Sequence, residues 1–219
     1  GTCIFTAKAV PSKGYRTFLL EDNEEKCEAE IRVTKTHMEN GFISIDLNEK
    51  GQFISIYDKK AARELLPEGQ AANVLMSYED RPHNYDAWDL NNYYTEKSWE
   101  IDDVAEIQVE ECGPVRGCLK VTRNYLDSVI SQYICIYQNT ARIDIKNEID
   151  WKEHQIFVKA LFPVDIHTGE ASFEIQYGNV KRPTHANTSW DFAKFEVCVH
   201  KWLDVSEDGY GVSVLNDCK

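Results

Sequence analysis

The chain has 219 residues, of which 42% are hydrophobic and 11% aromatic, so it can bury a sizeable core and general disorder is excluded. Its formal net charge of −13 makes nucleic acid and anionic membranes poor partners, because an acidic surface repels phosphate groups. The sequence offers no run of roughly 18 apolar residues for a membrane helix and no signal peptide at its start.

In chain order, residues 1–25 are expected to form a short edge or linking β segment, with a turn at 10–15. The first residue is Gly1 rather than Met, so we expect a piece of a longer protein. Residues 26–219 are expected to form one β domain that is truncated at its C-terminal end. One short helix is expected at 58–66, before Pro67.

Apolar residues alternate with polar ones over most of this domain, which predicts strands rather than helices. A hairpin is expected to turn at residues 48–51, where Gly51 tolerates a positive φ. The strands are expected around residues 31–33, 43–47, 54–56, 107–109, 119–121, 134–136, 143–145, 156–162, 173–177, 195–199 and 212–214. So many short strands predict an all-β fold, a large antiparallel β-sandwich.

Two segments break this alternation, at residues 79–103 and 179–191. Long irregular loops in compact domains are usually functional or disordered, and the first is too aromatic for disorder. Sugars are bound by flat apolar rings and by acceptors for their hydroxyl groups. The candidate sugar-binding residues are therefore the rings and polar groups of the two segments, namely Tyr85, Asp86, Trp88, Asp89, His185, Asn187, Trp190 and Asp191.

Other chemistries have weaker support in the sequence. The six histidines are scattered, and no C-x-x-C, H-x-x-x-H, nucleophile elbow or phosphate loop occurs. Asp86 and Asp89 lie on one loop, which cannot set the spacing of a glycosidase carboxylate pair. Seven cysteines without a paired motif indicate free thiols in a reducing, cytoplasmic compartment, with Cys135 and Cys198 as small buried hydrophobes.

Several short sequence words resemble the C-terminal β-rich region of glycoside hydrolase family 38 α-mannosidases, in the cytosolic and bacterial branch. They occur in family order along nearly the whole chain, at residues 10–15, 55–59, 79–82, 85–89, 150–153, 162–164, 182–185, 187–191, 195–196, 209–212 and 215–219. The resemblance implies a galactose-mutarotase-like supersandwich. It also implies a retaining enzyme that releases terminal α-linked mannose from mannose-containing oligosaccharides.

In that family the nucleophile and a divalent metal, zinc or cobalt, belong to an N-terminal catalytic domain whose motifs are absent from this sequence. The resemblance therefore implies no catalytic residue, metal ligand or cofactor in this chain, which would be inactive alone. The catalytic domain of the same polypeptide is its expected partner, and Tyr85 lies where a family tyrosine approaches the sugar. A stand-alone carbohydrate-binding module and a purely structural domain remain as alternatives.

Overall fold

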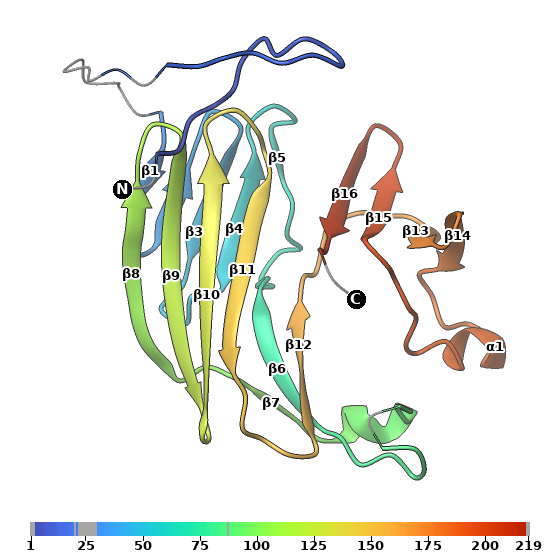
Figure 1. Cartoon of the computed structure of the whole chain (residues 1–219). Helices are drawn as coiled ribbons and strands as arrows, with labels where there is room; N and C mark the ends of the chain where they lie inside the picture. The colour runs from blue at the N-terminus through green and yellow to red at the C-terminus, as the bar shows by residue number, and fades with distance from the viewer. Residues whose placement is uncertain (1–2, 20, 22–29, 87, 218–219) are drawn as a thin grey trace. The chain divides into compact units, whose positions relative to one another are not determined.

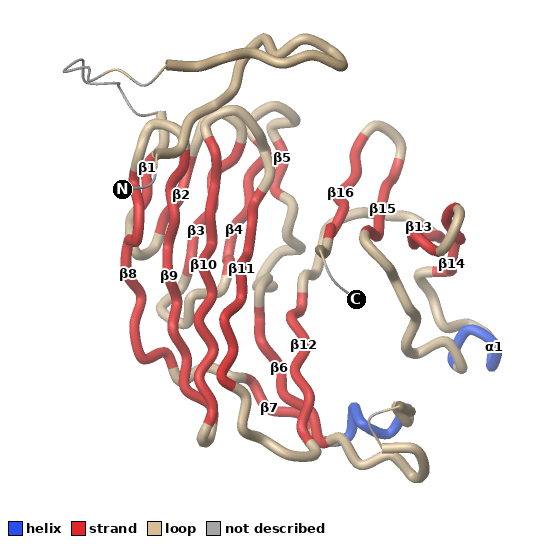
Figure 2. Tube along the Cα trace, viewed as in Figure 1, coloured by secondary structure: helices blue, strands red, loops and turns tan. Residues whose placement is uncertain are grey.

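The computed structural model describes residues 3–19, 21, 30–86 and 88–217. Almost every regular element in this part of the chain is an antiparallel strand, so the all-β prediction is confirmed (Figures 1 and 2). The chain divides into two compact units. Unit 1 contains residues 1–63 and 102–153, and unit 2 contains residues 64–101 and 154–219.

Unit 1 contains two sheets. The five-stranded sheet follows chain order, with β1 Arg32–Val33, β2 His37–Glu39, β3 Ile43–Leu47, β4 Phe53–Asp58 and β5 Arg63–Glu64. The four-stranded sheet has the order β11-β10-β9-β8, with β8 Val104–Cys112, β9 Arg116–Tyr125, β10 Ser128–Tyr137 and β11 Ile143–Asp150. Alternate side chains of β3 and β10 are buried, as the period-two pattern predicts for a strand with one buried face.

The two sheets of unit 1 pack face to face as a sandwich, visible as two layers in Figure 1. Gly51, with φ of +69°, comes so close to β9 that an added Cβ would lie 2.7 Å from Cγ1 of Val121. The inner faces bury Met38, Ile45 and Phe53 from one sheet against the β9 and β10 side chains of the other. This apolar burial, at about 25 cal/mol per Å², is the main stabilising contribution in unit 1.

Arg123 on β9 is a charged side chain inside this core, with only 1% of its surface exposed. Its guanidinium donates to Oε1 of Gln132 at 2.7 Å and to the carbonyl oxygens of Lys50 at 2.8 Å and Gly51 at 3.2 Å. Burial lowers the pKa of Arg123 to about 10, so the group remains charged at neutral pH. The arginine therefore ties the 48–51 turn to the opposite sheet.

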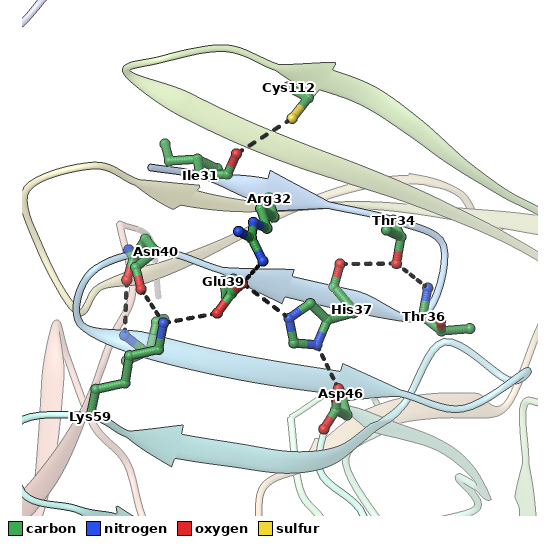
Figure 3. A network of polar contacts seen from close by, with 11 residues as sticks. Ile31, Arg32, Thr34, Thr36, His37, Glu39, Asn40, Asp46, Lys59 and Cys112 are labelled. Carbon is green, nitrogen blue, oxygen red and sulfur yellow. Dashed lines mark hydrogen bonds and ion pairs between the residues drawn. The ribbon is translucent and has the colours of Figure 1, made fainter. Parts of the chain in front are cut away.

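A polar network covers part of the outer surface of the β1–β4 sheet (Figure 3). The carboxylate of Glu39 accepts from Nζ of Lys59 at 2.9 Å and pairs with Arg32 at 3.2 Å. His37 lies beside it, with Nδ1 2.7 Å from Oδ1 of Asp46. The hydrogen bond from Lys59 is the main reason that the pKa of Glu39 is lowered.

Unit 2 also contains two sheets, but buries far fewer side chains. The three-stranded sheet has the order β12-β6-β7, with β6 Val74–Glu79, β7 Ser98–Glu100 and β12 Ile156–Leu161. The four-stranded sheet has the order β14-β13-β15-β16, with β13 Glu170–Ile175, β14 Gly178–Pro183, β15 Trp202–Glu207 and β16 Tyr210–Leu215. Its helices are the 3-10 helix η1 at Asn92–Glu96 and the one-turn helix α1 at Ser189–Phe192.

Two secondary-structure predictions are wrong. The helix expected at 58–66 is absent, because the Asp58 carboxylate accepts the N–H groups of Lys60 and Ala61, and Ala62 has φ of +52°, so the chain turns into β5. The strand expected at 195–199 is an irregular segment, which contacts other parts of unit 2 through side chains and carbonyl groups.

Two further segments differ from the sequence prediction. Residues 3–19 contain a turn in which Gly14 N–H donates to the Pro11 carbonyl, and no strand, so the expected β character is not found there. The predicted domain boundary at 25–26 lies outside the described residues. The segment 179–191, expected to be irregular, begins as strand β14 and ends in helix α1.

The cysteine prediction needs correction. Cys118 on β9 and Cys135 on β10 form a disulfide, because the hairpin register places the two residues directly opposite each other. Cys3, Cys112 and Cys198 are free and exposed, so the expected burial of Cys198 is also wrong. Cys27 and Cys218 lie outside the described residues. None of the helices in the described part of the chain is long and apolar enough to cross a membrane.

Candidate functional site

The first candidate segment is the loop between β6 and β7, and its base is well anchored. The Glu79 carboxylate accepts from Nζ of Lys97 at 2.8 Å and pairs with Nε of Arg81 at 3.3 Å. The hydroxyl of Tyr93 donates to the carbonyl of Arg81 at 2.9 Å. These contacts join the two ends of the loop, so its tip is presented from a fixed base.

The tip of this loop exposes its aromatic rings. Tyr85 is 75% exposed and Trp88 is 90% exposed. Tyr85 has φ of +58°, a conformation that costs an L-residue about 1–2 kcal/mol. Its carbonyl accepts the N–H groups of Trp88 and Asp89, both at 2.9 Å, which closes the turn. Burial of the Tyr85 ring does not offset this backbone cost, because the ring is largely exposed.

A carboxyl group lies at the start of the same loop. The pKa of Asp80 is raised, first by burial of its carboxyl group and then by the nearby Asp86 carboxylate. Its N–H donates to the carbonyl of Gln155 at 2.7 Å, which joins the loop to the residues just before β12. Asp80 and Asp86 together give this part of the loop a negative field, which suits hydroxyl donors rather than anions.

A cluster around Lys159 fixes the other end of the loop, and we call it the lysine clamp: Lys159, Tyr94 and Glu196. Nζ of Lys159 donates to the Tyr94 hydroxyl at 2.6 Å and to the Glu196 carboxylate, and the Tyr94 hydroxyl donates to the same carboxylate at 2.6 Å. The ammonium group also lies 4.4 Å from the centre of the Tyr94 ring. The clamp joins helix η1, strand β12 and the segment 195–199.

The clamp also shifts two pKa values. Burial is the larger reason that the pKa of Tyr94 is raised, and its hydrogen bond to Glu196 adds to this. Burial alone would lower the pKa of Lys159, but its hydrogen bonds to Glu196 and Tyr94 raise it overall. Both shifts favour a protonated lysine and a neutral tyrosine at neutral pH. The clamp therefore keeps its protons at neutral pH and acts as a structural contact rather than as a proton carrier.

The second candidate segment follows β14, and most of its polar groups serve local structure. Thr188 caps helix α1, since its hydroxyl accepts the N–H of Asp191 at 3.2 Å while its own N–H and hydroxyl donate to Oδ2 of Asp191. These hydrogen bonds from Thr188 are the main reason that the pKa of Asp191 is lowered. Nδ1 of His185 lies 3.6 Å from the same carboxylate oxygen. The hydrogen bonds between Thr188 and Asp191 form the reciprocal capping pattern of a helix start.

A cavity of about 290 Å³ lies beside this segment. It is lined by Phe173, Arg182, Pro183, Thr184, His185, Ala186, Asp191, Phe192, Lys194, Phe195 and Val197. A larger hollow of about 540 Å³ elsewhere in unit 2 is lined by Gln70, Ala71, Ala160, Leu161, Phe162 and Pro163. Gln70 supplies the one polar side chain of the larger hollow, so we regard the smaller cavity as better equipped to orient a polar ligand.

The predicted site residues fall into two groups. Tyr85, Asp86, Trp88 and Asp89 share the loop tip, and none of the four lines either cavity. His185 and Asp191 line the smaller cavity, whereas Asn187 is exposed and Trp190 is 79% exposed outside it. The structure thus brings His185 and Asp191 together. A sugar contact by any of the eight residues stays a prediction.

The sequence did not predict the three side chains of the lysine clamp or the two cations of the smaller cavity, Arg182 and Lys194. Tyr94 and Arg182 lie within the irregular segments 79–103 and 179–191, but their ring and guanidinium were not selected. Lys159 and Lys194 are lysines on a strand and after a short helix, and no local motif distinguishes them from other surface lysines. Their roles come from contacts between segments distant in sequence.

The described residues do not fit a metal site. No three His, Cys, Asp or Glu side chains among residues 3–19, 21, 30–86 and 88–217 lie close enough to hold one ion. A zinc or cobalt ion would need at least that many protein ligands. We therefore derive no chemical step through a metal for these residues.

Comparison with known proteins gives a consistent set of relatives. Residues 38–219 match the family model described as the C-terminal domain of glycosyl hydrolases family 38. The chain is 35% identical over 187 residues to human "Alpha-mannosidase 2C1", with 83% of this chain and 18% of the relative covered. It is 36% identical over 191 residues to "Alpha-mannosidase G" of Dictyostelium discoideum, with 83% of this chain and 17% of the relative covered.

A solved structure shows the same fold. It is the crystal structure of an alpha-mannosidase from Enterococcus faecalis V583, with a TM-score of 0.73 and 15% sequence identity. The match covers 90% of this chain and 25% of that one. The chain thus spans less than a fifth of the length of the two curated relatives and a quarter of the solved structure.

Proposed function

Since the chain belongs to glycosyl hydrolase family 38 and forms part of its C-terminal domain, we propose that it completes the sugar site of an α-mannosidase. The loop tip with Tyr85, Asp86, Trp88 and Asp89 contacts the terminal mannose. Cleavage of the glycosidic bond, with retention, is left to a catalytic domain of the same polypeptide. That domain also supplies the ligands of the zinc or cobalt ion, and the complete enzyme acts in the cytoplasm.

One observation carries this proposal: two large aromatic side chains are exposed on a loop whose base is rigidly held. Exposed aromatic rings that lie on one loop mark a contact with a ligand or another surface more often than a single exposed ring such as Tyr177 does. The neighbouring carboxylates of Asp86 and Asp89 can accept from vicinal hydroxyl groups, and the ring of Trp88 offers a face for the C–H side of a sugar. Fixing the sugar in this way lowers the entropic part of the barrier.

The decisive experiment measures mannoside hydrolysis by the full-length enzyme. Asp86→Ala is expected to lower kcat/KM about 10- to 100-fold, since a hydrogen bond to a charged group contributes about 1.5–3 kcal/mol. Tyr85→Phe removes one neutral hydrogen bond and is expected to lower kcat/KM about 3- to 10-fold. Neither variant should change the melting temperature, because both side chains are exposed.

Tyr177 provides a matched control in the same unit. It is fully exposed, lies in a turn and has φ of +65°, so it shares the exposure and backbone conformation of Tyr85. Tyr177→Phe should leave kinetics and stability unchanged. Wild-type kcat/KM from a folded Tyr85→Phe/Asp86→Ala double variant would contradict the proposal.

A stand-alone carbohydrate-binding module is the second candidate function, and the exposed indole rings of Trp88 and Trp190 favour it. Titration of the 219-residue chain with mannose and manno-oligosaccharides, followed by tryptophan fluorescence, separates the two. Saturable quenching that is lost in Trp88→Ala would favour the module. A flat titration, together with impaired hydrolysis by the full-length variants, favours the contribution to a shared sugar site.

A further inference from the structure

The smaller cavity of unit 2 differs from the loop tip in the sign of its charge. Its lining includes Arg182, Lys194 and one carboxylate, that of Asp191. The loop tip, in contrast, carries Asp86 and Asp89 and no arginine or lysine among residues 82–96. The chain as a whole has a net charge of −13, so a cavity lined by two cations is a local reversal of its field.

Arg182 is held in place with most of its donors unused. Its guanidinium carbon lies 4.7 Å from the centre of the Phe173 ring, and Nη1 donates to the carbonyl of Cys198 at 3.3 Å. A guanidinium has five N–H donors, and this is its one hydrogen bond within the described part of the chain. A stacked, planar guanidinium of this kind is suited to bidentate binding of a carboxylate or phosphate.

The second cation of the cavity is also available. The ammonium group of Lys194 forms no hydrogen bond or ion pair with the described residues, although its charge contributes to the lowered pKa of Asp191. The Asp191 carboxylate is occupied by Thr188 and His185, as described above. Neither Arg182 nor Lys194 is therefore neutralised by a direct ion pair with that carboxylate.

The rest of the lining is apolar. Phe192 and Phe195 are both partly exposed, and Pro183 and Val197 complete this part of the cavity. A volume of about 290 Å³ is at the lower end for ligand pockets and suits one small molecule. Rings beside cations fit a ligand with an apolar face and a negative group.

We propose that this cavity binds the anionic group of a modified sugar, a phosphate or a carboxylate, with Arg182 as the bidentate donor and Lys194 as the second positive charge. The C–H face of the sugar ring lies against Phe192. The anion-binding half of this inference stands on the cavity alone, and the sugar half rests on the proposed function. The shared chemistry of the two ligand types is a planar or tetrahedral oxyanion.

The test is isothermal titration calorimetry, which measures the Kd of the full-length protein for four probes: inorganic phosphate, mannose 6-phosphate, mannuronate and mannose. Mannose 6-phosphate or mannuronate is expected to bind saturably, with inorganic phosphate weaker. Arg182→Gln and Lys194→Gln should each raise the Kd for the anionic probes at least tenfold, as loss of a charged hydrogen bond implies. Mannose binding should be unchanged, and raising the salt concentration should weaken only the anionic probes.

Lys181→Gln is the matched control, since Lys181 is the neighbour of Arg182 on β14, carries the same charge and does not line the cavity. It should bind every probe as wild type does. Lys194 lies outside the strands, so Lys194→Gln keeps the test valid if Arg182→Gln fails to fold. Equal affinities in Arg182→Gln, Lys194→Gln and Lys181→Gln would overturn the proposal, as would no binding of any anionic probe.

The two proposals fail in different ways. If inorganic phosphate binds through Arg182 but mannose 6-phosphate and mannuronate bind no better than phosphate, the sugar half is wrong and the anion site stands. If Tyr85→Phe and Asp86→Ala hydrolyse a neutral mannoside at the wild-type rate, the proposed function fails whatever the cavity binds.

Discussion

Units 1 and 2 are both made of antiparallel sheets, yet they differ in what holds them together. Of the 18 buried hydrophobic side chains in the described part of the chain, 13 belong to unit 1 and 5 to unit 2. Unit 2 instead relies on polar contacts such as the lysine clamp, and it displays Tyr85, Trp88 and Trp190 to solvent. Unit 1 is thus held together chiefly by its apolar core, whereas unit 2 buries little apolar surface and leaves the rings of Tyr85, Trp88 and Trp190 exposed.

The largest expected effect contrasts one ring from each unit. Phe53 in unit 1 is completely buried, so Phe53→Ala should lower the free energy of unfolding by about 3–5 kcal/mol. Trp88 in unit 2 is 90% exposed, so Trp88→Ala should change it by less than about 0.5 kcal/mol. Urea unfolding of the full-length variants measures both. A loss of several kcal/mol in Trp88→Ala would support the purely structural alternative.

The disulfide offers the next largest effect, again in unit 1. Cys118 and Cys135 are separated by 17 residues, and closing a loop of that length contributes up to about 3 kcal/mol. The β9–β10 ladder already restricts this hairpin, so we expect Cys118→Ser/Cys135→Ser to cost about 1–3 kcal/mol.

Alkylation of the unfolded protein before and after reduction checks whether the bond forms in cells. Two cysteines, identified by mass spectrometry as Cys118 and Cys135, should become reactive only after reduction. Cys112 provides the internal control, because it is free and exposed and should react at once. Reaction of Cys118 and Cys135 without reduction would contradict the disulfide, whereas reaction only after reduction would contradict the proposal that the enzyme acts in the cytoplasm, where thiols stay reduced.

Much of the fold was predictable because period-two alternation survives wherever one face of a strand is buried. The strands around Ile45, Leu119 and Ile134 were placed correctly for this reason. The disulfide follows from the register of the β9–β10 hairpin, whose two-residue turn at Leu126 and Asp127 places Cys118 opposite Cys135. The sequence does not mark this turn, because Leu-Asp lacks the Asn-Gly or Gly-X pattern typical of two-residue hairpin turns. The number and spacing of the cysteines did not predict this bond, because they do not show which residues lie opposite each other in a hairpin.

The candidate sites were only partly predictable. The loop tip was selected from the sequence because its aromatic and acidic residues lie close together in one long loop. The lysine clamp joins Tyr94, Lys159 and Glu196, which come from three segments, so no spacing rule reveals it. Asp191 was selected as a sugar contact and stays a prediction in that role, while the structure shows that its nearest contacts are the capping bonds of a four-residue helix.

The lysine clamp is expected to contribute less than the disulfide. Tyr94→Phe removes the hydroxyl that bonds both Lys159 and Glu196, in a half-buried site, so we expect a local loss of about 1 kcal/mol. Amide hydrogen exchange should therefore speed up about five- to tenfold in residues 90–97 and 195–199, with β9 and β10 unchanged. Tyr93→Phe, whose hydroxyl bonds only the Arg81 carbonyl, should leave residues 195–199 unaffected. Faster exchange throughout unit 1 would contradict the proposed separation of the two units.

The smallest expected effect concerns the polar network of Figure 3, on the surface of unit 1. The pKa of Glu39 is lowered below its ordinary value of 4.5, chiefly by the hydrogen bond from Lys59, with Arg32 adding to this. The contribution of Glu39 to stability is therefore fully present above about pH 4.5 and is lost as the pH falls through the lower, folded-state pKa. Because the pair lies at the surface, its size should stay within about 1 kcal/mol.

Glu39→Gln should accordingly lower the urea midpoint slightly at pH 7 and bring it close to wild type at the lowest pH at which the protein stays folded. Lys59→Met removes the main partner, so the pKa of Glu39 should rise toward 4.5 and the acid-dependent loss should shrink in the same way. Both substitutions remove the same interaction, so the double variant should lose less stability than the sum of the losses in the two single variants. A wild-type dependence of stability on pH in Glu39→Gln would mean that other carboxylates, such as Asp102 paired with Lys50, account for the acid sensitivity of unit 1.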